Sequence, residues 1–172
     1  PWRAVWNTNS LSTPCRLVFD ASQVTSTGFS LNHLLAKGRN NMNKLVEIAL
    51  RWQIRCSAFH TDIRKMYNTV RLSEEHWCYQ LYLWENELNL EETPKPKVIK
   101  TLIYGVRSSG NQAERGIRQT GNLMKDKYPR QNEIINSDIY VDDCLSGEKT
   151  LEEVYETTDC LKLVLNKGGD RK

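Results

Sequence analysis

Long apolar runs are missing from this sequence of 172 residues. No stretch approaches the roughly 20 apolar residues that span a bilayer, and the first ten residues lack the basic-then-apolar order of a signal peptide, so neither a membrane span nor export is predicted. Cysteine is also scarce: the five cysteines are odd in number and widely spaced, with no Cys-x-x-Cys pair. This pattern argues against a disulfide framework or a zinc site and favours a reduced, cytoplasmic setting.

Internal repeats and low-complexity tracts are absent too, which argues against a solenoid or a disordered linker. The length suffices for one sizeable core, divided into at most two lobes. Because the sequence opens inside a strand-like run, "PWRAVW", and stops just after a glycine pair, we expect it to be a piece of a longer polypeptide.

The net charge is only +3, but basic and acidic residues are concentrated in separate segments of the chain. Residues 37–71 and 95–130 are strongly basic, whereas residues 72–94 and 131–172 are acidic. Such blocks are typical of alternating solvated faces, but they also fit a surface that binds a polyanion. The scattered His33, His60 and His76 do not suggest a zinc cluster, and we interpret each as an ordinary surface or core histidine.

Strand and helix patterns alternate along the chain. Apolar and aromatic runs predict strands, apolar positions at helical spacing predict helices, and Thr150 with Glu153 forms a capping box that opens a last helix. Ser109 and Gln112 have the same capping spacing. The order predicts an α+β fold with an antiparallel sheet backed by helices. The predicted strands are 15–22, 57–62, 77–84, 98–105 and a hairpin within 138–147; the predicted helices are 41–53, 108–128 and the segment ended by Gly168 and Gly169.

Two adjacent aspartates, Asp142 and Asp143, lie in the predicted hairpin "DIYVDDCLSG". Alone, the pair is typical of a solvated turn. Asp62 changes this interpretation, because it ends the predicted strand "SAFHTD" and a strand end can point its carboxylate toward a neighbouring strand. Three converging carboxylates repel one another unless cations neutralise them. Hard oxygen ligands of this kind suit Mg²⁺.

Several short sequence blocks occur in this order: "RLVFDAS", "FHTDIRKMY", "YGVRSSGNQAER", "YVDDCLSG" and "LNKGG", with "SLNHLLAKGRNNMNKL" after the first. Together they resemble the reverse transcriptase of BEL/Pao long-terminal-repeat retrotransposons. The resemblance covers essentially the whole chain and implies a right-hand polymerase fold. It places the fingers subdomain at 1–40 and 70–107 and the palm subdomain at 41–69 and 108–172. The thumb, connection and RNase H domains would lie outside this chain.

The resemblance also implies a metal site. Asp62 and Asp142 would bind two Mg²⁺ ions, with Mn²⁺ as a substitute, while Asp143 and the Ile63 carbonyl would complete the coordination. Two ions of this kind, about 4 Å apart, clamp the attacking and leaving oxygens of a phosphoryl transfer.

Nucleotide and template contacts are implied in the same way. Tyr67 stands at the aromatic gate that excludes a ribose 2′-OH, and Arg16 stands at the arginine that contacts the triphosphate; a core aromatic and an ordinary surface arginine are the alternatives. Tyr104 replaces the glutamine of retroviral enzymes, and Ser109-Gly110 replaces Ser-Pro. The nucleotide-binding candidates are Arg16, Arg64, Lys65, Met66, Tyr67 and Tyr104; the template and primer candidates are Tyr140, Val141, Ser109 and Gly110.

The function expected from this resemblance is RNA-directed DNA synthesis from dNTPs on an RNA or DNA template-primer. In the parent polyprotein we expect protease, thumb, RNase H and integrase domains as partners, and no membrane. The alternative is a catalytically inactive, nucleic-acid-binding remnant of such a polymerase. A protein-interaction domain is a third hypothesis, favoured only by the mixed surface charge.

Overall fold

The structure is a computed structural model that describes residues 2–8, 14–84 and 93–169. It divides into two compact units. Unit 1 comprises Pro1–Gly38 with Arg71–Ser109, and unit 2 comprises Arg39–Val70 with Gly110–Lys172. The predicted segments 1–40 with 70–107 and 41–69 with 108–172 lie close to these bounds; their identification as fingers and palm stays a prediction.

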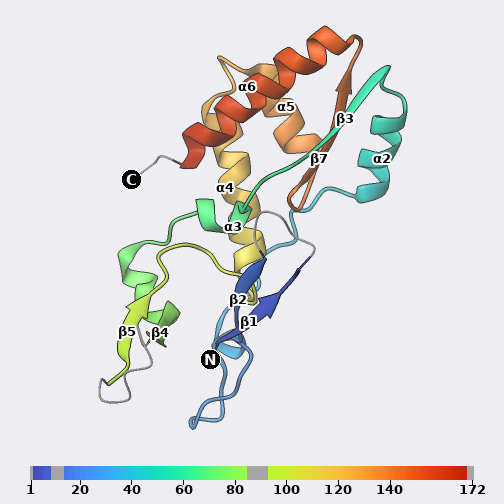
Figure 1. Cartoon of the computed structure of the whole chain (residues 1–172). Helices are drawn as coiled ribbons and strands as arrows, with labels where there is room; N and C mark the ends of the chain where they lie inside the picture. The colour runs from blue at the N-terminus through green and yellow to red at the C-terminus, as the bar shows by residue number, and fades with distance from the viewer. Residues whose placement is uncertain (1, 9–13, 85–92, 170–172) are drawn as a thin grey trace. The chain divides into compact units, whose positions relative to one another are not determined.

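Unit 1 is built on two antiparallel hairpins, which appear in the lower part of Figure 1. Strand β1 (Trp2–Trp6) pairs with β2 (Cys15–Phe19), and β4 (Leu81–Trp84) pairs with β5 (Lys95–Val98). Aromatic rings join the hairpins, since the Trp2 and Trp84 rings lie 5.5 Å apart and Phe19 meets Tyr82 edge to face at the same distance. A short helix α1 (Leu31–Leu34) and a 3₁₀ helix η1 (Glu74–Gln80) complete the unit.

The predicted strand 77–84 is half wrong, because Trp77–Gln80 belong to η1. Local side-chain bonds hold this turn: the Trp77 indole donates to the Leu72 carbonyl at 3.1 Å, and the buried Gln80 amide donates to the carbonyls of Ile99 and Thr101. The predicted partner strand at 98–105 is also misplaced, since β5 ends at Val98. The intervening residues 85–92 lie outside the described part of the chain.

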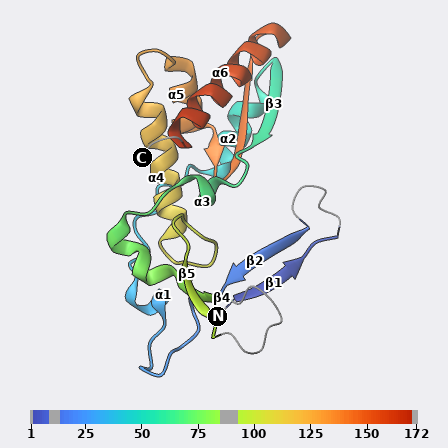
Figure 2. The same cartoon turned by 60° about the vertical axis from the view of Figure 1, so that its left-hand side comes forward.

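Unit 2 contains an antiparallel sheet of three strands in the order β3-β7-β6. The strands are β3 (Ser57–Asp62), β6 (Ile139–Tyr140) and β7 (Asp143–Glu148). Figures 1 and 2 show β3 and β7 running side by side along their length. Helices α2, α5 and α6 pack on this sheet. The helices that lie mainly in unit 2 are α2 (Leu45–Gln53), α3 (Met66–Thr69), α4 (Ser109–Leu123), α5 (Pro129–Ser137) and α6 (Leu151–Gly169).

The starts of α6 and α2 depend on different hydrogen bonds, which are local at α6 and long-range at α2. The predicted capping box of α6 is confirmed: the Glu153 amide donates to the Thr150 hydroxyl at 3.2 Å, and the Glu153 carboxylate accepts from the Thr150 amide at 3.3 Å. Helix α2 begins at Leu45, not at the predicted residue 41. The reason is tertiary, because Asn43 donates to the carbonyls of Asn136 and Ile139 and so fixes the preceding segment elsewhere.

Three further differences from the sequence predictions concern helices. Ser109 does not cap α4, since its buried hydroxyl has no hydrogen-bond partner. Helix α5 was not predicted at all, although Pro129 at its first turn is a recognised start signal. Gly168 and Gly169 are included in α6, and residues 170–172 lie outside the described part.

The apolar core of unit 2 lies between its helices and the sheet. Its side chains come from α2, α3, α4, α5, α6 and the two strands of the hairpin, which include segments far apart in the sequence. Together they fix the sheet that carries the predicted aspartates. The buried apolar residues of unit 2 are Ile48, Met66, Ala113, Ile117, Ile134, Ile135, Ile139, Cys144, Leu161 and Val164.

The described residues therefore form an α+β protein with antiparallel sheets, as the sequence predicts. No described helix combines the length and the apolar character needed to cross a membrane.

Candidate functional site

Asp62 ends strand β3 and faces the other predicted aspartates across the strand pair. The run "SAFHTD" alternates exposed and half-buried residues, as expected for a strand with one face on a core. It pairs antiparallel with β7 in a register that sets Asp62 directly opposite Asp143. Side chains directly opposite in such a pair lie on the same face of the sheet. Two carboxylates separated by 81 positions in the chain are thus neighbours.

Asp142 lies in the tight turn between β6 and β7. Tyr140 pairs with Asp143, which leaves Val141 and Asp142 as the two turn residues. Val141 has a φ of 58°, which a β-branched residue rarely adopts. The Asp142 carbonyl accepts a hydrogen bond of 2.7 Å from the Ile63 amide. This bond ties the hairpin turn to the residue that follows Asp62.

The segment after Asp62 turns sharply into α3. Lys65 is left-handed, with φ 54° and ψ 37°, and is exposed. The Ile63 carbonyl, a predicted metal ligand, accepts from the Met66 amide at 3.1 Å. One lone pair of this carbonyl and the amide of Met66, a nucleotide-binding candidate, are therefore already used. Non-glycine residues in this conformation are strained, and such strain clusters at functional sites.

Tyr67 and Gly110 lie beside each other in unit 2. A Cβ atom added to Gly110 would meet the Tyr67 hydroxyl at 3.7 Å, an ordinary contact distance. The predicted gate residue and one predicted template contact are therefore neighbours, although they come from α3 and from the start of α4. Tyr67 is half-buried and Gly110 is exposed.

The predicted metal site was compared with the side chains present. Among the described residues, no three His, Cys, Asp or Glu side chains form a group that could hold a metal ion. The donor chemistry nevertheless fits Mg²⁺, because Asp62, Asp142 and Asp143 supply carboxylate oxygens at one end of one sheet. The residues fit the ion in the type of their donor atoms, and strand pairing brings the three residues to one end of the sheet.

His60 was not predicted as a functional residue, yet it contacts one of the aspartates. Its Nε2 lies 2.9 Å from Asp143 Oδ1. The alternation of β3 puts His60 on the same face as Asp62, which the sequence could have indicated. The contact with Asp143 could not be foreseen, because it depends on the register between β3 and β7.

A buried polar cluster around Asp138 stabilises the hairpin formed by β6 and β7. Asp138, only 3% exposed, accepts hydrogen bonds from the Ser146 hydroxyl at 2.7 Å and from Arg51 Nε at 3.2 Å. The Arg51 guanidinium also donates to the Ser137 carbonyl. Because a buried carboxylate needs such partners, this cluster fixes α2 and β7 around the start of β6. Asp138 was not among the predicted functional residues, although it is the first residue of the motif "DIYVDDCLSG".

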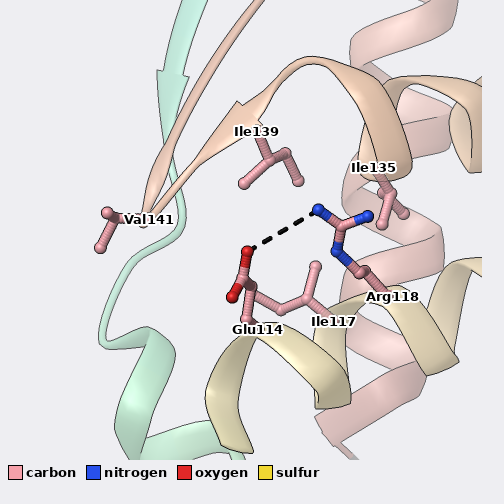
Figure 3. A pocket seen from close by; sticks show the side chains of 6 residues that line it. All are labelled: Glu114, Ile117, Arg118, Ile135, Ile139 and Val141. Atoms are coloured by element: carbon pink, nitrogen blue, oxygen red, sulfur yellow. Dashed lines mark ion pairs between the residues drawn. The ribbon is translucent and has the colours of Figure 1, made fainter. Parts of the chain in front are cut away.

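A small cavity lies next to the turn, as Figure 3 shows. It has a volume of about 10 Å³, about the least that holds one water, and Val141 is among its lining residues. Glu114 and Arg118 of α4 form an ion pair of 3.7 Å there (Figure 3). Burial raises the pKa of Glu114 above its ordinary value, and the Arg118 guanidinium only partly offsets this effect.

The remaining candidates belong to unit 1 or to unit 2, where Met66 is buried in the core. Arg16 lies in β2 opposite Val5, and its side chain is outside the described part. Tyr104 is 48% exposed and precedes Gly105, whose φ of 92° and close approach to the Phe19 carbonyl exclude a Cβ atom. In unit 2, Arg64 is exposed and Tyr140 is half-buried in β6.

A comparison of the sequence with protein-family models and with curated proteins finds no match.

Proposed function

We propose that this chain is a fragment of an RNA-directed DNA polymerase, with unit 1 as fingers and unit 2 as palm. The observation that supports it is the end of the β3-β7-β6 sheet. There the register sets Asp62 opposite Asp143, and the Ile63 amide binds the Asp142 carbonyl. Two of the sequence blocks that carry the polymerase resemblance thus meet at one end of the sheet. A merely solvated hairpin turn would not need a third carboxylate opposite it.

The reaction is attack of a primer 3′-OH on the α-phosphate of a dNTP, in which a P–O bond forms and pyrophosphate leaves. Asp62 and Asp142 would hold two Mg²⁺ ions, and Asp143 would assist. When bound, the ions supply charge neutralisation for the attacking and leaving oxygens. The protein contributes mainly by positioning the reactants.

The other residues of unit 2 would serve this positioning. Arg64 and Lys65 are exposed cations two and three residues after Asp62, at a place where nucleotide phosphates would lie. Tyr67, beside Gly110, would limit the space next to the nucleotide sugar. In unit 1, Arg16 and Tyr104 are proposed as further nucleotide contacts, while Tyr140, Val141 and the exposed Gly110 of unit 2 are proposed as contacts to template and primer.

The experiment that tests this proposal is primer extension on an RNA template with dNTPs and Mg²⁺. We expect Asp142→Asn to lower the extension rate at least about a hundredfold, because a direct metal ligand is lost. Asp126→Asn, at an exposed aspartate elsewhere in unit 2, is the matched control and should retain the wild-type rate. Equal extension by wild type and Asp142→Asn would refute the catalytic assignment.

A binding measurement distinguishes the inactive remnant from the polymerase. Template-primer binding should weaken steeply as salt is raised, because contacts to phosphates release counterions. Salt-dependent binding without extension in the same preparation would favour the remnant. Absence of both binding and extension would refute both nucleic-acid hypotheses.

A further inference from the structure

The contact between His60 and Asp143 is a specific feature of the aspartate end of the sheet. His60 Nε2 lies 2.9 Å from Asp143 Oδ1, and the two side chains are 54% and 48% exposed. An exposed pair of this kind contributes little to stability. Its position beside the predicted ligands suggests a different role.

The strand geometry places His60 on the ligand face. His60 and Asp62 are two residues apart on β3, so their side chains point to the same face of the sheet. Asp143 is opposite Asp62, and His60 is opposite Leu145, so His60 reaches Asp143 diagonally. His60, Asp62 and Asp143 therefore share one small area of one face.

The hydrogen bond has only one possible direction when Asp143 is ionised. A carboxylate can only accept, so the imidazole must carry its proton on Nε2 and donate it. One lone pair of Oδ1 is then used by His60, which favours Oδ2 as the oxygen that faces a cation. Carboxylates that bind metals are commonly held by a neighbouring donor in this way.

We propose that His60 is a positioning residue, which orients the Asp143 carboxylate toward a divalent cation held with Asp62 and Asp142. This inference rests on the proposed function, because the cation is the one that the polymerase reaction needs. It goes beyond that function by assigning a role to a histidine that the motifs do not include. It also predicts which Asp143 oxygen meets the ion.

The first test measures binding of Mn²⁺, used as the probe, by calorimetry on the whole chain without nucleic acid. His60→Leu removes the donor at similar size and should weaken Mn²⁺ binding about tenfold. His60→Gln keeps an N–H donor at a similar reach and should stay within about threefold of wild type. His76→Leu is the matched control, because the His76 side chain is also 54% exposed but belongs to unit 1.

A double variant then asks whether His60 acts through Asp143. In an Asp143→Asn background, His60→Leu should cause no further loss of Mn²⁺ affinity. A full additional tenfold loss in that background would overturn the positioning role. Thermal unfolding of each variant should match wild type, so that a change in affinity is not a change in folding.

A second test needs no metal. In ¹⁵N-detected NMR of the metal-free chain, the His60 ring should carry its proton on Nε2. Asp143→Asn should change the ¹⁵N shifts of that ring, and Asp126→Asn should not. A His60 ring that is insensitive to Asp143→Asn would contradict the hydrogen bond itself.

The outcomes separate this inference from the proposed function. If Asp62→Asn and Asp142→Asn weaken Mn²⁺ binding but His60→Leu does not, only the role of His60 is refuted. If wild type binds no Mn²⁺, the metal site and the role of His60 fail together. If Mn²⁺ binding depends on His60 but primer extension fails, the positioning role stands and the polymerase assignment is refuted.

Discussion

The two units differ in the residue types that adopt left-handed backbone conformations. Within the described part of unit 1, every residue with a left-handed φ is a glycine: Gly28, Gly38 and Gly105. In the described part of unit 2, the left-handed residues are Lys65 and Val141. Both flank the predicted catalytic aspartates. Unit 1 thus avoids strain, whereas unit 2 holds it at the proposed site, where a rigid surrounding structure is required.

The burial of the two units explains why unit 2 can hold this strain. Its core comes from five helices and the sheet, whereas Leu102 is the one buried apolar side chain in the described part of unit 1. Unit 1 relies instead on aromatic contacts between its hairpins and on polar contacts. Asn32 donates to Ser22 and to the Gly105 carbonyl, and it accepts from the Arg107 amide. We therefore expect unit 1 to open locally more readily than unit 2.

The largest expected difference concerns cysteine reactivity. Burial, assisted by the nearby Asp138 carboxylate, raises the pKa of Cys144 in unit 2 from 9.0 to about 12, while Arg130 acts in the opposite direction. At pH 8 its thiolate fraction should be about a thousandfold smaller than that of an ordinary thiol. Mass spectrometry after iodoacetamide treatment should find Cys144 protected and the exposed Cys56 and Cys78 modified. Rapid alkylation of Cys144 in the folded chain would contradict the burial of β7.

The next prediction tests the core of unit 2. Ile134→Ala, at a side chain with no exposed surface, should lower the unfolding free energy by about 2–5 kcal/mol in urea denaturation. Leu81→Ala in unit 1, at a side chain that is 58% exposed, is the control and should cost less than about 1 kcal/mol. Similar losses for the two variants would remove the contrast between the units.

A smaller effect tests the strain itself. Lys65→Gly should raise the unfolding free energy by up to about 1 kcal/mol, because relief of a left-handed penalty of about 1–2 kcal/mol exceeds the entropy cost of glycine of about 0.5–1 kcal/mol. The neighbouring Arg64 does not have a positive φ. Arg64→Gly should therefore lower stability by up to about 1 kcal/mol, since glycine gains more backbone entropy on unfolding. A loss of stability in Lys65→Gly, measured by the same denaturation, would refute the strain.

The smallest effect is a pH dependence within unit 2. Because burial raises the pKa of Glu114, the folded protein keeps this proton to a higher pH than the unfolded chain does. The unfolding free energy should therefore fall as pH rises from the ordinary glutamate range through the raised pKa, and then become level. Glu114→Gln should flatten this part of the profile in urea denaturation at a series of pH values. Glu156→Gln, at an exposed position, should retain the wild-type profile.

The parts of the fold that depend on local signals could be predicted from the sequence. Strand β3 has the predicted bounds 57–62, the 138–147 hairpin is present, and Thr150 caps α6 with Glu153. The strand predicted at Trp77–Gln80 is wrong, because strand propensity is weak compared with side-chain hydrogen bonds such as that from the Gln80 amide to the Ile99 carbonyl. The start of α2 was also missed, because the Asn43 side chain binds carbonyls more than 90 positions away.

The sequence by itself determined which residues carry the proposed chemistry, because Asp62 ends a strand pattern and Asp142 and Asp143 lie in a two-residue turn. Only the tertiary structure decided that Asp143 faces Asp62 and meets His60, and that Asp138 is buried with Arg51 and Ser146. The physical reason is that side chains along a strand alternate between the two faces of the sheet. A shift of the register by one position would therefore turn every side chain of β7 to the other face. That register is fixed by packing between segments far apart in the chain, and no local pattern of residues records it.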